Sequence, residues 1–199
     1  QVNADNCNDV DEQGHTPMFY ARQHQQADII DYLLTIGAQP GADKSLLIEE
    51  ALTALSLPLL KVFLKHGCSL PATRNGLPLL HDLILNKRCK AVHVAFLQEH
   101  GCDINFIDSQ ITGLTLLAWY LQQRDFPVDT LRVEWLIKLG ANVNLAQDAS
   151  KTPIYIALTN PELRDTQETM SVTRFGSVLN KLVKGGVALD LEFDYRGTA

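Results

Sequence analysis

The segment 11–38, DEQGHTPMFYARQHQQADIIDYLLTIGA, constrains the fold of this chain more than any other part of the sequence. Gly14 suits a tight turn. Thr16 followed by Pro17 is typical of a helix start, because threonine caps the first turn and proline loses no hydrogen bond there. Apolar residues then recur at helical spacing, and Gly37 is placed to end a second helix. The segment therefore predicts a turn followed by two antiparallel helices.

The end of this segment recurs along the chain, as YLLTIGAQP, VFLKHGCSL, FLQEHGCDIN, WLIKLGANVN and, more loosely, KLVKGGVALD. The glycines in these endings follow one another at intervals of 30, 34, 39 and 46 residues, so the last two intervals contain insertions. A single helical pair cannot bury its own apolar face, so the recurrence predicts one stacked array. We call these residues the marker glycines: Gly37, Gly67, Gly101, Gly140 and Gly186.

This order of signals resembles the ankyrin repeat, whose fingerprint is a turn, a Thr-Pro-Leu-His-x-Ala helix and a Leu-Leu-x-x-Gly-Ala helix. The first helix reads TPMFYA here, with Phe19 in the usual histidine place, and GLPLLHDL, GLTLLAWY and SKTPIYIA keep parts of the motif. The resemblance implies an all-α fold, a solenoid of stacked helix-turn-helix pairs with hairpin loops. A single domain over 1–199 is expected, with partial repeats at both ends and full repeats near 11–40, 41–72, 73–107, 108–146 and 147–190.

Composition and charge argue against a membrane protein and against a nucleic-acid-binding protein. The chain is 46% hydrophobic and 20% charged, which is enough apolar material for a continuous core. It has no membrane-length apolar stretch and no N-terminal signal pattern, so we expect a soluble protein that does not enter a membrane. The net charge of −6 without a long basic run argues against nucleic acid and favours a basic segment as partner.

Cys68 and Cys102 form the one cysteine pattern, since each follows a marker glycine and lies two residues after a histidine, His66 or His100. Two His-x-Cys pairs could supply metal ligands. The alternative, which we favour, is that each cysteine replaces a buried alanine as a small hydrophobe. We therefore expect no metal, no cofactor and no disulfide framework. A reducing compartment follows, either the cytoplasm or the nucleus, or the host cytosol for an effector.

Catalytic motifs are missing from the sequence: it has no nucleophile elbow, phosphate-binding glycine loop, zinc-binding His-Glu-x-x-His helix or CxxC pair. The chain is therefore not expected to be an enzyme. His81 stands at the histidine position of the family and is expected to be structural. The insertion 123–130 leaves open whether Phe126 is buried or exposed. The insertion 160–176 is expected to be a loop, with a helical turn or two as the alternative.

The resemblance also implies a binding surface, the concave face made by the hairpin tips and the exposed side of each first helix. Within it, Leu77, Leu85, Ile111 and Leu114 are expected to form an apolar patch inside a polar rim, which is typical of a protein interface. We therefore predict that the third and fourth repeats hold the main anchor. The predicted partner-binding residues are Glu12, Gln13, His15, Gln23, His24, His66, Arg74, Asn75, Leu77, Leu85, Asn86, His100, Ile111, Thr112, Leu114, Gln122, Gln123 and Lys151.

The predicted function is a non-catalytic scaffold for protein–protein interaction, which acts as a monomer and binds a partner protein through its concave face. An alternative is that the repeats form the substrate-targeting arm of a larger multidomain enzyme or of a secreted bacterial effector. The partial repeats, NADNCND at the start and DYRGTA at the end, keep that alternative open, because they predict that the chain is part of a longer protein.

Overall fold

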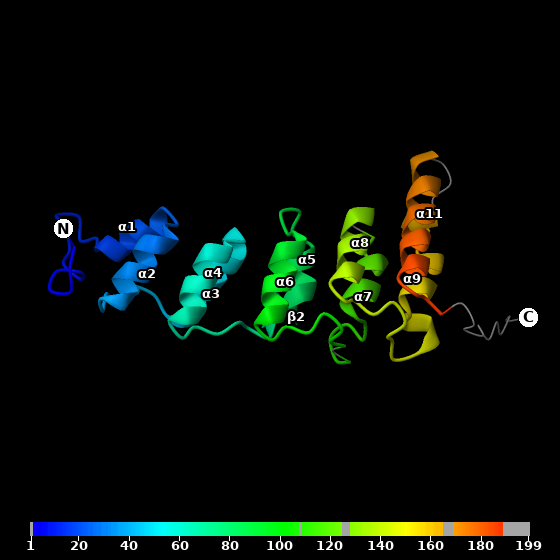
Figure 1. The fold of residues 1–199 in the computed structure, drawn as a ribbon, viewed down its shortest axis with the longest axis horizontal. Coiled ribbons are helices and arrows are strands. Elements are labelled where there is room, and N and C mark those ends of the chain that lie inside the picture. Colours follow the sequence, from blue (N-terminus) through cyan, green and yellow to red (C-terminus); the bar gives the residue numbers. More distant parts are fainter. Residues whose placement is uncertain (1, 108, 125–127, 165–168, 189–199) are drawn as a thin grey trace, which may run out of the picture. The chain divides into compact units, whose positions relative to one another are not determined.

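A computed structural model of the chain describes residues 2–107, 109–124, 128–164 and 169–188 (Figure 1). The chain divides into two compact units, Gln1–Pro71 and Ala72–Ala199, which are described separately. The first unit contains α1 (Pro17–Gln23), α2 (Ala27–Thr35), α3 (Lys44–Ala54) and α4 (Leu57–Lys65). The second contains β1 (Thr73–Arg74), β2 (Leu77–Pro78), α5 (Leu79–Ile84), α6 (Ala91–Glu99), α7 (Leu116–Gln122), α8 (Thr130–Lys138), the 3-10 helix η1 (Ala149–Lys151), α9 (Pro153–Thr159), α10 (Pro161–Arg164) and α11 (Thr169–Lys184).

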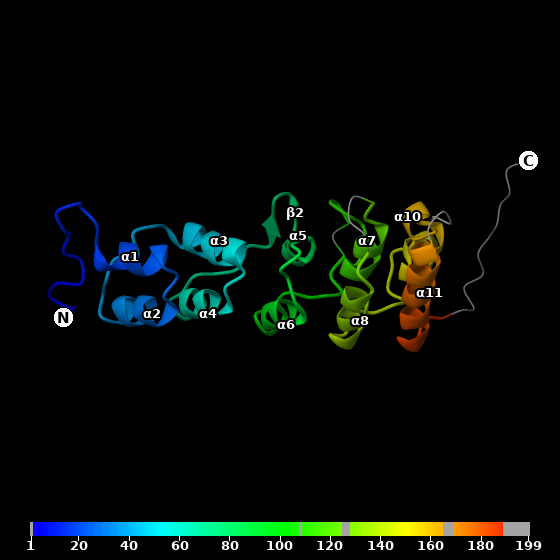
Figure 2. The same ribbon diagram turned by 90° about the horizontal axis from the view of Figure 1, so that it is seen from above.

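The helices of each unit form two layers (Figure 2). In the first unit, α1 and α3 lie in one layer, and α2 packs against α4 in the other. In the second unit, α7 lies between α5 and α9 and contacts both, while α8 contacts α6 and α11 in the other layer. The first helices of successive pairs thus stack on one another, and so do the second helices. This arrangement confirms the predicted all-α fold of stacked helical pairs.

The helix starts follow the cap signals of the sequence. The Thr16 hydroxyl accepts a hydrogen bond from the backbone N–H of Phe19 at 3.2 Å, and Pro17 occupies the first turn of α1. Ser56 caps α4 in the same way, with Pro58 in the first turn. The helix ends also follow the prediction, because the marker glycine Gly140 has a φ of +96°, a backbone conformation that strains other residues.

The core of the second unit lies between its two layers and is built from leucines of α7, such as Leu117 and Leu121, which are fully buried. His81 is buried there as well, and its ring lies edge-on to Trp119 with the centroids 5.1 Å apart. Tyr120 is also buried. The structure accommodates its ring in the core, where the hydroxyl accepts a hydrogen bond from the backbone N–H of Asp129 at 2.9 Å. Burial raises the pKa of Tyr120.

Side chains from one repeat bind the hairpin of the next within each unit. The Asn105 amide donates to the Gly140 carbonyl at 2.9 Å and accepts from the Asn142 N–H at 2.7 Å. Asn144 bridges in the same way to Gly186 and Ala188. These asparagines satisfy backbone groups of the neighbouring hairpin, so they fix the spacing of adjacent helical pairs. Asn8 makes the same bridge to Gly37 and Gln39. Within the second repeat, the Lys44 ammonium donates to the Gly67 carbonyl at 3.1 Å.

The long insertion at 160–176 is more helical than expected. The loop prediction is wrong for Pro161–Arg164, which is α10, and for residues 169–176, which belong to α11. The side-chain amide of Asn160, which is buried, donates to the Leu121 carbonyl at 2.7 Å and holds the start of the insertion on α7. Phe126, of the shorter insertion, lies outside the described residues.

Candidate functional site

Three rings contact one another at the surface of the first unit, at the start of α1. The His15 ring stacks on the Phe19 ring, with centroids 3.9 Å apart and an interplanar angle of 3°. Tyr20 lies edge-on to both rings, at 5.6 Å from His15 and 5.4 Å from Phe19. Phe19 is 41% exposed and Tyr20 is 37% exposed. We call these three residues the ring cluster.

The hairpin before α1 positions the ring cluster. The Asp11 carboxylate accepts hydrogen bonds from the backbone N–H groups of Gln13 and His15, both at 2.9 Å, and this closes the turn. The backbone N–H of Asp11 in turn donates to the His15 carbonyl at 3.0 Å. Thr16 then caps α1, so Phe19 and Tyr20 lie in the first turn of the helix, next to the hairpin.

A carboxylate is built into this cluster. The Tyr20 hydroxyl donates to the second oxygen of Asp11 at 2.5 Å. This hydrogen bond, and the one from the backbone N–H of His15, hold the pKa of Asp11 below its usual value. The same contact raises the pKa of Tyr20. At neutral pH the site therefore carries an ionised carboxylate and a neutral phenol whose oxygen can accept a further hydrogen bond.

The predicted site residues of the first unit lie on its surface with one qualification. Glu12 and Gln13, in the hairpin, and Gln23 and His24, at the end of α1, are exposed. His66 is half-buried, and its Nε2 lies 2.7 Å from the Asp31 carboxylate. The hairpin residues therefore form a polar edge next to the rings. His66, at the end of α4, instead contacts Asp31 of α2.

The predicted apolar patch of the second unit is wrong at Leu114, which is only 4% exposed. Leu114 belongs to the buried run that continues into α7, so its side chain belongs to the core. Leu77 and Leu85 are half-buried, and Ile111 is exposed. The expected anchor in the third and fourth repeats therefore lacks one of its four members, and two others show only part of their surface.

The remaining predicted residues are mostly engaged in bonds within the second unit. Arg74 and Asn75, at the tip of the β1–β2 hairpin, both bond the Asp82 carboxylate, at 2.8 and 2.9 Å. The rest are distributed along the unit. Asn86 is half-buried and Gln122 is exposed. His100 Nδ1 lies 2.8 Å from the Phe96 carbonyl oxygen, and the Thr112 hydroxyl donates to the Leu114 carbonyl. Gln123 donates to the Trp119 carbonyl, and Lys151 donates to the Gln147 side chain.

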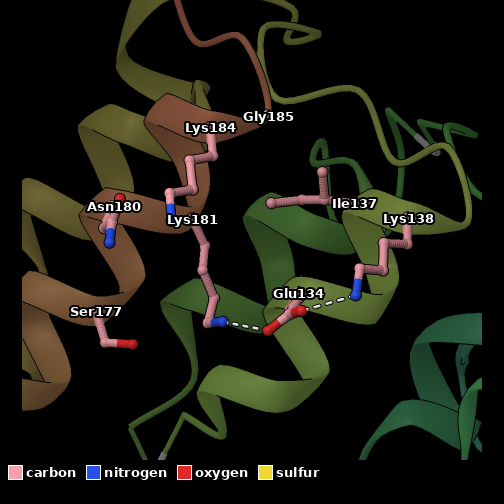
Figure 3. Close-up of a pocket in the computed structure, with 8 residues that line it drawn as sticks. All are labelled: Glu134, Ile137, Lys138, Ser177, Asn180, Lys181, Lys184 and Gly185. Atoms are coloured by element: carbon pink, nitrogen blue, oxygen red, sulfur yellow. Dashed lines mark hydrogen bonds and ion pairs between the residues drawn. The ribbon is translucent and has the colours of Figure 1, made fainter.

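An open hollow of about 300 Å³ lies between α8 and α11 of the second unit (Figure 3). Glu134 stands at its edge and forms ion pairs with Lys138 and Lys181. These two lysines lower the pKa of Glu134 to about 2. None of the predicted site residues lines this hollow, which belongs to the layer of second helices. Because the two ion pairs satisfy the Glu134 carboxylate, we assign no ligand to the hollow.

The sequence prediction missed two members of the ring cluster, Phe19 and Tyr20. The available signal was the replacement of the family's histidine by Phe19, next to a tyrosine at the variable position of the same motif. The apolar spacing of the sequence places Tyr20 with Met18 and Ala21 on one apolar face of the first helix, and it places Phe19 only at the histidine position of the repeat motif. In the structure that face is Met18 and Ala21, which are buried, whereas the two rings are turned outward.

The alternative metal site finds no counterpart in the described part of the chain, where no three His, Cys, Asp or Glu side chains gather around a common point. The cysteines are free thiols, and Cys68 is buried as expected for a small hydrophobe, whereas Cys102 is only half-buried. No helix in the described ranges has both the length and the apolarity that a membrane span needs.

Comparison with known proteins agrees with the geometry of the two units. No protein-family model and no curated protein sequence matches the chain. Among solved structures, the chain is similar to an ankyrin repeat domain from Acinetobacter baumannii AYE, with a TM-score of 0.52 and 22% sequence identity. The match covers 92% of this chain and 87% of the bacterial domain. The repeated endings, the capped helical pairs and this match together identify the fold of the chain as the ankyrin-repeat fold.

Proposed function

We propose that this chain is a protein-interaction module with no catalysis of its own, and that a partner protein binds the hairpin and the exposed side of α1. The observation that carries the proposal is the ring cluster, in which three rings in mutual contact stand at the surface beside a carboxylate. Aromatic side chains dominate the binding energy of protein interfaces, because they bury a large area at a small cost in conformational entropy.

The exposed rings contribute little to the stability of the first unit, because other residues complete its core and its hairpin. Met18 and Ala21 bury the core side of α1, and the hairpin is already closed by the Asp11 carboxylate. Phe19 and Tyr20 therefore expose apolar surface whose burial would be favourable. Exposed apolar patches rimmed by polar groups mark binding sites in soluble proteins, and Glu12 and Gln13 supply such a rim here.

The anchor proposed here differs from the one predicted in the third and fourth repeats. In that patch Leu114 is buried and Leu77 and Leu85 are half-buried, whereas Phe19 and Tyr20 are both exposed and their rings are in contact. The partner is therefore expected to depend on the first repeat, with the exposed positions of the other repeats adding contacts that contribute less to the affinity.

Affinity purification tests this proposal. The full chain and a Phe19→Ala, Tyr20→Ala variant are used as baits in an extract of the cells that make the protein, and bound proteins are quantified by mass spectrometry. We expect one protein to be lost with the variant. For an interface hot spot, the affinity measured with that purified protein should fall at least about 30-fold, which corresponds to about 2 kcal/mol.

A matched control comes from α2 of the same unit, where Ile29 and Tyr32 are 47% and 50% exposed. An Ile29→Ala, Tyr32→Ala variant removes as much exposed apolar surface from the layer of second helices. It should keep the partner. The proposal is wrong if the control loses the partner as completely as the ring variant does, or if neither loses any protein while both remain folded by circular dichroism.

A further inference from the structure

The ring cluster leaves part of an aromatic surface open to a ligand. His15 covers one face of the Phe19 ring, in parallel stacking at 3.9 Å, yet Phe19 still exposes two-fifths of its surface. The Tyr20 hydroxyl donates its proton to Asp11, so its oxygen offers only lone pairs to a ligand. Ring surfaces, a phenol oxygen and a carboxylate are all groups that attract a cation.

The charged residues of the segment that leads into the ring cluster are all acidic. Residues 1–21 contain Asp5, Asp9, Asp11 and Glu12 but no lysine or arginine. The first basic residue, Arg22, is held by Glu50 in an ion pair with an N···O distance of 2.5 Å. Within the described residues, no lysine or arginine forms an ion pair with any of the four carboxylates. Their negative charge is therefore available to a partner.

The same asymmetry distinguishes the two units. Residues 1–71 contain nine acidic and four basic side chains, a net charge of −5, whereas residues 72–199 contain fourteen acidic and thirteen basic side chains, a net charge of −1. Almost all of the net charge of the chain thus belongs to the unit that carries the ring cluster. Such a surface favours encounter with a positively charged segment and disfavours an acidic one.

From these observations, and resting on the proposed function, we propose that the ring cluster binds an arginine side chain from a basic segment of the partner protein. The guanidinium group stacks on the open ring surface and directs its N–H groups to the Tyr20 oxygen and to the carboxylates of the hairpin. Arginine fits better than lysine, because its planar, weakly hydrated group both stacks on rings and forms a fork of hydrogen bonds.

Peptide titration of the full chain tests the inference. The probes are a short peptide of arginine, glycine and serine, and the same peptide with citrulline in place of arginine, which keeps the shape and removes the charge. Binding is followed by the NMR signals of the Phe19 and Tyr20 rings. We expect the arginine peptide to bind at least about tenfold more tightly than the citrulline peptide, and to lose affinity as salt is added.

Three variants test whether the arginine peptide binds at the ring cluster. Asp11→Asn keeps an oxygen that can accept the N–H groups of Gln13 and His15 but removes the charge, so it should weaken the arginine peptide several-fold. Asp28→Asn removes an exposed carboxylate from α2 of the same unit and should change the affinity much less. Phe19→Leu keeps an apolar side chain without the ring and should also weaken binding.

Equal binding of the arginine and citrulline peptides would overturn the inference, and so would signal changes confined to residues away from the rings. These outcomes are distinct from a failure of the proposed function. A partner protein that is lost with the Phe19→Ala, Tyr20→Ala variant, but binds through a segment without arginine or lysine, would support the interaction surface and contradict the arginine.

Discussion

Replacing Leu114 by aspartate is expected to lower the free energy of unfolding of the second unit by about 5 kcal/mol. The Leu114 side chain is 4% exposed, so the change removes a buried apolar group and places a carboxylate where water does not reach it. Because a typical domain is stable by only about 5–15 kcal/mol, this loss amounts to at least about a third of the stability of the unit. Urea unfolding followed by tryptophan fluorescence measures it, since Trp119 and Trp135 both belong to this unit.

Ile111 provides the matched control, because it is an apolar residue of the same hairpin that is 43% exposed. Ile111→Asp should change the free energy of unfolding by less than about 1 kcal/mol, as surface substitutions usually do. If the two aspartate variants were equally stable, Leu114 would stand at the surface after all, and the apolar patch predicted from the sequence would be restored.

Replacing Arg132 by alanine is expected to have the next largest effect, a loss of about 3 kcal/mol from the second unit. The Arg132 guanidinium, on α8, reaches the end of α5 and donates to the carbonyls of Ile84, Asn86 and Lys87, the last two at 3.1 and 3.0 Å. Without it these carbonyls lose a charged donor, and the C-terminal end of α5 loses a favourable positive charge.

Two further variants separate this capping from a general effect of charge. Arg132→Lys keeps the charge but cannot reach three carbonyls with one fork of donors, so its stability should lie between those of the wild type and the alanine variant. Arg124→Ala removes an exposed arginine of the same unit and should leave stability unchanged within about 0.5 kcal/mol. A loss as large for Arg124→Ala as for Arg132→Ala would show that overall charge, not the capping of α5, is responsible.

Much of the fold could be predicted from the sequence, because it depends on local signals. The Thr16–Pro17 and Ser56–Pro58 starts each cap a helix through their own neighbours, and a marker glycine such as Gly140 ends one through its own backbone. Such signals act over a few residues, so helix starts and ends can be predicted from them even where the repeat motif is incomplete. The second repeat, near 41–72, illustrates this, since its sequence lacks the Thr-Pro-Leu-His motif but α3 and α4 still form.

The candidate site was harder to predict, because exposure depends on how each helix is rotated against its neighbours. Leu114 and Ile111 lie three residues apart in one hairpin, and the sequence contains no signal that one is buried and the other exposed. The apolar spacing likewise assigns Tyr20 to the apolar face of α1, although Met18 and Ala21 suffice to cover the core side and Tyr20 is exposed. The bonds of Arg132 join residues more than forty positions apart, beyond the reach of a local pattern.

Photo-crosslinking inside the cells that make the protein tests the central claim most directly. A benzophenone amino acid is placed at Phe19 in one variant and at Tyr32, an aromatic residue of α2 that is at least as exposed, in the other. The interaction module proposed here predicts that a partner protein crosslinks from position 19 and not from position 32. A partner that crosslinks from position 32 alone, or from neither position although it is recovered with the chain, would contradict the claim that the ring cluster is the binding surface.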